Sequence, residues 1–131
     1  MKSPRVVAAV LVRNKEGKFL LAKETLEDGN EYWLIPGGKV KFGETIKQAA
    51  IRELKEEFGI EVELESFVGF HEAVFPRYNY HSIIFFFTGI AKNEPKFVKE
   101  AIEARFFSID EIKNLNLVSS AKWCLEKLGF I

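Results

Sequence analysis

The sequence has little of several residue types, and each shortage excludes a class of protein. Cys124 is the only cysteine among 131 residues, which excludes a disulfide framework and suits the reducing cytoplasm. The 19 basic and 19 acidic residues balance, so the basic excess typical of nucleic-acid-binding proteins is missing. The longest strongly apolar run, residues 83–87, is far too short to cross a bilayer. We therefore expect a cytoplasmic protein with no membrane association and no stable nucleic-acid partner.

The chain does contain enough apolar material for a full core. Hydrophobic residues make up 47% of the sequence and include 13 phenylalanines, and 131 residues is a common length for one domain. No linker, internal repeat or low-complexity tract divides the chain. We expect a single domain over residues 1–131 with a small-molecule partner, as a monomer or a homodimer.

Capping residues mark the borders of two helices. Thr45, with Gln48 three positions later, matches a capping box that opens a helix, and Gly59 suits the left-handed position at its end. Ser108 with Glu111 forms a second capping box. Good helix formers fill the stretch between Thr45 and Gly59, which makes this helix the clearest prediction along the chain.

Apolar periodicity and turn residues predict the other elements. The expected strands cover residues 6–12, 19–23, 32–35, 60–65, 82–90 and 103–107, and the expected helices cover 46–58, 109–114 and 119–128. The first two strands should form a hairpin, residues 36–38 should stop the third strand, and residues 70–81 should form a surface loop. This order predicts an α+β protein with a mixed β-sheet covered by helices on both sides, an α/β/α sandwich.

The helix expected at residues 46–58 places acidic side chains on its apolar side. On a wheel at about 100° per residue, Glu53 and Glu57 share an arc with Ile46. Glu56 lies at one edge of the same arc. Like charges at these spacings destabilise each other, and partial burial strengthens that effect because desolvation also opposes ionisation. The cluster therefore needs a positive partner.

A divalent cation is one such partner. Hard oxygen donors at helical spacing suit Mg²⁺ or Mn²⁺, and zinc is disfavoured because no cysteine or histidine accompanies them. The alternative is a solvated acidic face paired with lysine and arginine side chains, as in many helices without a metal site.

Residues 38–60 carry a spaced set of glycine, glutamate and arginine residues, GKVKFGETIKQAAIRELKEEFGI. This segment resembles the Nudix box of the Nudix hydrolase (MutT-like) family, whose pattern is G, five residues, E, seven residues, then R-E-U-x-E-E-x-G-U with U a bulky aliphatic residue. Every fixed position is filled, by Gly38, Glu44, Arg52, Glu53, Leu54, Glu56, Glu57, Gly59 and Ile60. Residues 33–38 and 104–112 also resemble the family's segments before the box and near the C-terminus.

The resemblance implies the Nudix fold, a mixed sheet between helices, and divalent-metal-dependent hydrolysis of a pyrophosphate link. It implies that the metal is held by the carboxylates of Glu53, Glu56 and Glu57 and by the carbonyl of Gly38. It also implies that Glu44 and Arg52 pair and brace the loop against the helix. Because a cluster of glutamates repels a polyphosphate, the substrate should arrive together with its cations.

The resemblance leaves the general base open. Family members use either a glutamate of the box or one from a distant loop. Glu100 and Glu103 lie just before the strand expected at 103–107, where the family often places such a carboxylate. We rank Glu100 first as the base from outside the box and place Glu103 among the substrate-binding residues. Both could instead be solvated loop charges.

The segment 70–81 is the expected specificity loop. Phe75 and Tyr78 could stack on a base, and Arg77 could bind a phosphate. The position of Pro76 relative to the box resembles a spacing of ADP-ribose hydrolases, whereas that of Tyr78 resembles a spacing of dinucleoside polyphosphate hydrolases. These two indications conflict, so the segment does not select a substrate.

Three functions follow from the resemblance. The first is a Mg²⁺-dependent pyrophosphohydrolase, with Mn²⁺ as a possible substitute, that acts on nucleoside diphosphate derivatives and first of all on nucleoside triphosphates. The second is a pyrophosphatase for ADP-ribose or another nucleotide sugar. The third, from a different class, is a non-catalytic Nudix-fold nucleotide sensor, which the complete set of box glutamates disfavours. RNA decapping is disfavoured because no basic segment is evident.

Overall fold

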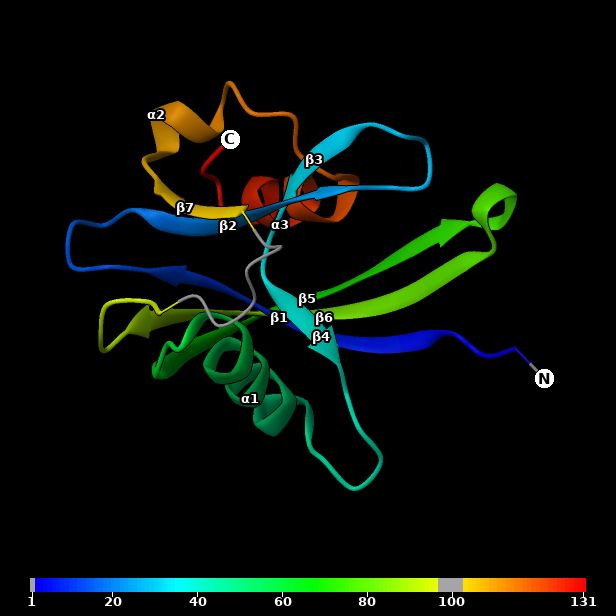
Figure 1. Ribbon diagram of the computed structural model, residues 1–131, viewed down its shortest axis with the longest axis horizontal. Helices are drawn as coiled ribbons and strands as arrows, with labels where there is room; N and C mark the ends of the chain where they lie inside the picture. The colour runs from blue at the N-terminus through cyan, green and yellow to red at the C-terminus, as the bar shows by residue number, and fades with distance from the viewer. Residues whose placement is uncertain (1, 97–102) are drawn as a thin grey trace.

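The computed structural model describes residues 2–96 and 103–131, and its elements surround one mixed sheet (Figure 1). Its helices are α1 (Ile46–Phe58), the 3-10 turn η1 (Pro76–Tyr78), α2 (Ile109–Ile112) and α3 (Ser119–Lys127). Its strands are β1 (Arg5–Arg13), β2 (Phe19–Thr25), β3 (Glu31–Leu34), β4 (Gly37–Lys39), β5 (Val62–Phe75), β6 (Tyr80–Ala91) and β7 (Glu103–Phe107). Glu100 lies outside the described residues.

Strand β1 organises the sheet. It runs parallel to β6 over nine consecutive pairs, from Arg5 opposite Ser82 to Arg13 opposite Ile90. The main order is β3-β2-β1-β6-β5, with β7 paired to β2. The expected antiparallel hairpin of the first two strands is confirmed. A single residue pair, Arg13 with Phe19, is matched between them. Because β1 and β2 separate beyond that pair, β4 can pair with β1 in the space between them.

Helices cover both faces of the sheet, as the sequence predicts. On one face, α1 buries Ala49, Ala50, Leu54 and Phe58 against β1 and its neighbours. On the other face, α2 and α3 bury Ile112, Ala121, Cys124 and Leu125. Figure 1 shows α1 on one side and α2 with α3 on the other. The predicted α+β class, with a mixed β-sheet between helices, is confirmed. Full burial raises the pKa of the Cys124 thiol to about 12.

The helix ends follow the predicted caps. Thr45 and Gln48 exchange the two hydrogen bonds of a capping box, and Ser108 and Glu111 do the same at α2. Gly59 ends α1 with φ at 61°, the left-handed conformation that glycine adopts without strain. The helix that carries the Nudix-like box is therefore fixed at both ends by its own sequence.

The expectation of a surface loop over residues 70–81 is wrong. Strand β5 continues to Phe75 and β6 starts at Tyr80, so only a tight turn separates them. Pro76 opens the 3-10 turn, and Asn79 closes it with φ at 55°, a conformation that asparagine tolerates. The strands pair up to Phe75 opposite Tyr80, which satisfies backbone groups that a loop would expose to water. The aromatic residues of this segment are thus strand residues beside the turn.

The third strand ends at Leu34, just before residues 36–38, as the sequence predicts, but two of these residues start a strand of their own. Gly37 and Gly38 belong to β4 and pair with Ala9 and Ala8 of β1. A Cβ on Gly37 would meet the Cβ of Ala9 at 2.7 Å, so only glycine allows this close pairing. Within the described part of the chain, no helix is long and apolar enough to cross a membrane.

Candidate active site

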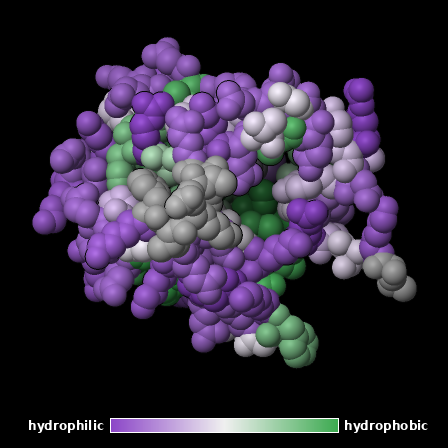
Figure 2. Space-filling view, in the orientation of Figure 1, coloured by the Kyte–Doolittle hydropathy of each residue, from purple (hydrophilic) through white to green (hydrophobic). Residues whose placement is uncertain are grey.

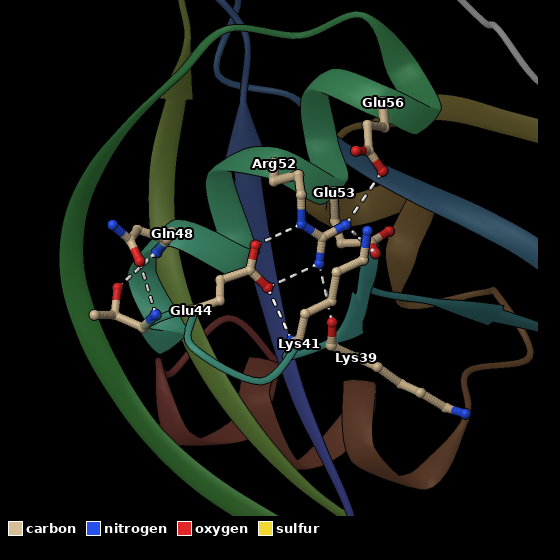
Figure 3. A network of polar contacts seen from close by, with 8 residues as sticks. Lys39, Lys41, Glu44, Gln48, Arg52, Glu53 and Glu56 are labelled. Carbon is tan, nitrogen blue, oxygen red and sulfur yellow. Dashed lines mark hydrogen bonds and ion pairs between the residues drawn. The ribbon is translucent and has the colours of Figure 1, made fainter.

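The guanidinium of Arg52 is the centre of a polar network on α1 (Figure 3). Its Nε donates to Glu44 Oε2 at 2.6 Å and its Nη2 donates to Glu44 Oε1 at 3.0 Å, a bidentate pair. The same Nη2 donates to the carbonyl of Lys39 at 3.0 Å. Glu44 also accepts from the backbone N–H of Lys41 at 2.9 Å. Arg52 and Glu44 therefore fasten the segment between β4 and α1 to the helix.

These hydrogen bonds shift the pKa values of both partners. The bonds from Arg52, then that from the Lys41 N–H, lower the pKa of Glu44 from its ordinary 4.5 to about 2. The bond to Glu44 in turn raises the pKa of Arg52 above its usual value. The Arg52 side chain is only 19% exposed, although the helical wheel places it on the solvated side. Because the pKa of Glu44 is far below 7 and that of Arg52 is far above it, the ion pair is fully formed at neutral pH.

Two of the predicted metal-binding glutamates contact the same arginine nitrogen. Arg52 Nη1 donates to Glu53 Oε1 at 2.9 Å and to Glu56 Oε2 at 3.2 Å. The Glu53 side chain is 16% exposed and that of Glu56 is 56% exposed. Glu57 is half-buried on the same helix. The wheel thus predicted the partial burial of Glu53 and Glu57 correctly, whereas Glu56, which it placed at the edge of the arc, is exposed.

Gly38 lies directly against Glu53. A Cβ built on Gly38 would overlap the carboxyl group of Glu53, with Oε2 at 2.5 Å. Strand β4 therefore passes close to the helix at the first position of the box, and its backbone adjoins a carboxylate. Glycine permits this close approach because it has no Cβ.

The donor chemistry of this cluster fits a hard divalent cation. Carboxylates of α1 and the backbone of Gly38 supply oxygen atoms, and Arg52 shows that Glu53 and Glu56 can converge on one positive group. Among the described residues, however, no three acidic, histidine or cysteine side chains are gathered tightly enough to hold an ion. Side-chain rotation of the glutamates away from Arg52 would be needed to assemble such a site.

A cavity of about 580 Å³ adjoins the box on the face of the sheet opposite α1. Figure 2 shows a hollow with hydrophobic residues at its bottom. Residues 37–39 line the cavity, so the strand that contacts Glu53 is also one of its walls. The volume is in the usual range for small-molecule sites.

The structure brings together some of the predicted substrate residues but not all of them. Phe75 and Tyr78 line the cavity, whereas Arg77 and Glu103 are not among its lining residues. The Arg77 guanidinium lies over the Tyr78 ring at 5.6 Å, and Glu103 forms an ion pair with Lys23 at 3.1 Å. Both therefore have partners on the surface of the sheet.

Sequence reasoning missed other lining residues. They include Arg5, Tyr80 and Ser82, the segment 24–27 at the end of β2 and just after it, and Ser119 and Ser120 at the start of α3. One signal was available, because residues 80, 82, 84 and 86 alternate along a strand and must share a face. Nothing local indicates that this face is hollowed, since the cavity forms between segments far apart in the chain.

Comparison with known proteins agrees with this geometry. The family model of the NUDIX domain matches residues 2–128, which is nearly the whole chain. The chain belongs to the NUDIX domain family. The prediction made from the box is thereby confirmed at the level of family.

Similar proteins support the same assignment. Phosphatase NudJ of Escherichia coli K12 is 40% identical over 76 residues, which are 58% of this chain and 48% of the relative. The match thus spans about half the length of that relative. The MutT NUDIX hydrolase of Burkholderia pseudomallei superposes with a TM-score of 0.85 at 23% identity, covering 97% of this chain and 99% of the other. The MutT protein of Methanosarcina mazei Go1 superposes with a TM-score of 0.81 at 26% identity, covering 98% of this chain and 96% of the other. The Nudix fold is confirmed.

Proposed function

We propose that this chain, as a single domain, is a Mg²⁺-dependent Nudix pyrophosphohydrolase that cleaves nucleoside diphosphate derivatives. The main support is the close packing of Gly38 on Glu53 beside the Arg52 network, next to a cavity that reaches the same strand. Family membership agrees, because Nudix enzymes generally use a divalent metal. Mn²⁺ offers the same octahedral oxygen chemistry and could replace Mg²⁺.

In this proposal Glu53, Glu56 and Glu57 hold the cation, with the Gly38 carbonyl as a further donor. The bound metal would neutralise phosphate charge and lower the pKa of an attacking water. Arg52 and Glu44 position the helix and the preceding loop without contacting substrate, as their mutual hydrogen bonds indicate. A box glutamate, or Glu100 from outside the box, accepts the proton of the water.

The cavity supports a nucleotide as substrate. Phe75 and Tyr78 provide aromatic faces at its wall, and Lys39 provides a positive charge on the strand next to the box. A base in the cavity would leave its phosphates near Gly38. Nucleoside triphosphates are our first candidates, and ADP-ribose or another nucleotide sugar is the second, because each carries one base and at least one pyrophosphate link. Glu103 and Arg77 would act only on parts of the substrate outside the cavity.

The compartment and partners follow from the same proposal. Cys124 is a free, buried thiol, which suits the reducing cytoplasm. A small-molecule nucleotide is the expected partner, and the choice between monomer and homodimer awaits a measurement of mass in solution.

The decisive experiment is a substrate screen with a metal control. The purified chain is incubated with nucleoside triphosphates, ADP-ribose and nucleotide sugars in Mg²⁺, in Mn²⁺ and in EDTA, and the products are separated by chromatography. We expect a nucleoside monophosphate plus pyrophosphate from a triphosphate, or AMP plus a sugar phosphate from ADP-ribose. Release of orthophosphate instead would indicate a phosphatase reaction, as the name of the similar NudJ suggests for that protein. Binding without metal-dependent turnover of any nucleotide would identify a sensor and contradict the proposal.

A further inference from the structure

Ser82 is a buried polar residue whose hydroxyl has no partner. Its exposed fraction is 0%, and its Oγ has no hydrogen bond to any described residue. Buried hydroxyl groups are nearly always hydrogen-bonded, because burying one without a partner has a substantial free-energy cost. The fold of β6 does not require a hydroxyl here, since alanine would fill the same position at a lower cost of burial.

The position of Ser82 on β6 directs its side chain to the cavity. Residues 80, 82, 84 and 86 alternate onto one face of the strand, and all four line the cavity. The neighbours of Ser82 across the sheet are Arg5 on β1 and Ala73 on β5, and these line the cavity too. Ala73 is small, so the hydroxyl lies at a recessed part of the floor.

The walls around this floor suit a planar ring. The rings of Phe75 and Tyr80 are 6.1 Å apart at their centroids, and the guanidinium of Arg5 lies over the Tyr80 ring at 5.2 Å. On the opposite side, the first N–H groups of α3 have no intrahelical partner, as at any helix start, and Val118 at the N-cap offers them no side-chain hydrogen bond. The Val118 N–H donates to the carbonyl of Trp33 at 3.0 Å, and the Trp33 N–H donates to the carbonyl of Asn116 at 2.8 Å, which holds this helix start in place. The cavity thus combines apolar faces with hydrogen-bonding groups at its edges.

We propose that Ser82 is a specificity-determining residue that hydrogen-bonds an exocyclic oxo or amino group of the nucleobase in this cavity. This inference rests on the proposed function for the presence of a nucleotide. A serine hydroxyl can donate or accept, so it can pair with either group. A base that lacks the exocyclic group would leave the Ser82 hydroxyl unpartnered, and the site would therefore discriminate against it.

The test compares Ser82→Ala with the wild type on two nucleotides. One is the best substrate of the screen, or the nucleotide that binds most tightly if none is hydrolysed, and the other is its analogue with the same ring but without the exocyclic group. We expect the wild type to prefer the first by about tenfold or more in kcat/KM, and Ser82→Ala to lose about tenfold of that preference. The loss should appear in KM, with kcat within about twofold, because the hydroxyl does not contact the reacting atoms. Ser66→Ala, an exposed serine on β5, is the matched control and should keep the wild-type preference.

Stability separates this role from a structural one. Since Ser82→Ala removes an unpartnered buried hydroxyl, its denaturant midpoint without ligand should equal or exceed that of the wild type. A lowered midpoint with an unchanged substrate preference would show that the hydroxyl serves the fold and would overturn the inference. An unchanged preference with an unchanged midpoint would overturn it as well.

Binding measurements keep the two proposals apart. Dissociation constants for the same two nucleotides are measured by calorimetry with Ca²⁺ in place of Mg²⁺. If the wild type binds with the expected preference but hydrolyses nothing in Mg²⁺ or Mn²⁺, the proposed function fails and the inference on Ser82 stands. If the wild type hydrolyses nucleotides but Ser82→Ala keeps the full preference, only the inference fails. If the wild type binds neither nucleotide, the inference is wrong.

Discussion

The carboxyl group of Glu53 occupies the space that a Cβ on Gly38 would need. The glycine at the start of the box and the first glutamate of its helix are therefore in direct contact, although 14 residues lie between them in the sequence. This contact gives a physical reason for a glycine at the first position of the box. A larger residue at position 38 would move either the strand or the carboxylate.

Gly38→Ala should reduce turnover far more than stability. The added Cβ meets the flexible end of Glu53, which can rotate away, so the fold is retained while the carboxylate leaves its position. Gly37→Ala is the informative comparison, because its Cβ would overlap the carbonyl oxygen and Cβ of neighbouring β1 residues, which cannot rotate away. We expect Gly37→Ala to lower the denaturant midpoint more than Gly38→Ala does. Equal midpoints with normal turnover for Gly38→Ala would show that the contact is dispensable.

Replacing a box glutamate should abolish most of the activity. Glu53→Gln, Glu56→Gln or Glu57→Gln should each lower kcat by about 10²-fold or more if the residue binds metal or acts as base. Glu53→Gln also removes repulsion between two carboxylates that share Arg52 Nη1, so its stability in EDTA should be unchanged or higher. Glu63→Gln, an exposed strand residue, is the control for loss of one charge. Full activity in Glu53→Gln together with a loss of stability would assign the residue to the fold alone.

The Arg52–Glu44 pair should contribute to stability in a pH-dependent way. The pKa of Glu44 in the folded protein is about 2, against an ordinary value of 4.5, so the unfolded chain takes up its proton first as the pH falls. The stabilisation is therefore complete above about pH 4.5 and is lost as the pH approaches 2. Glu44→Gln should be less stable than the wild type at pH 7, and urea unfolding should show the difference shrinking between pH 4.5 and pH 2. A difference that stays constant over this range would mean that charge is not involved.

Tyr78 should affect substrate binding more than chemistry. Its ring lines the cavity at the turn between β5 and β6, and stacking on a base is worth about 1–3 kcal/mol in single-stranded nucleic-acid sites. Tyr78→Ala should raise KM by about one to two decades with a smaller change in kcat. Arg77→Ala is a useful partner, because the Arg77 guanidinium covers the Tyr78 ring but does not line the cavity, so its effect should be smaller. An unchanged KM for Tyr78→Ala, with a shift from dimer to monomer on size exclusion, would place the ring in a subunit interface instead.

Local signals predicted the elements that depend on neighbours in sequence. The caps of α1 and α2 depend on residues three positions apart, and the half-burial of Glu53 follows from helical periodicity. The extension of β5 to Phe75 could not be predicted in this way, because it depends on pairing with Tyr80 and the residues after it. The candidate site, too, could be predicted only in part. The residues of the box were recognisable from their spacing, whereas the cavity depends on strands and a helix start brought together only by the fold.

The parallel pairing of β1 with β6 has a consequence for the order in which the protein assembles. This pairing joins residues 5–13 to residues 82–90, a contact between distant parts of the chain that cannot form while a ribosome has made only the first half. Non-local pairings of this kind slow folding, because a long loop must close before the contact forms. Helix α1 packs on one side of these strands and the cavity opens on the other. A nascent chain that has completed the whole box, through Ile60, would thus have every glutamate of the box and still lack the strand β6 that forms part of the cavity beside them.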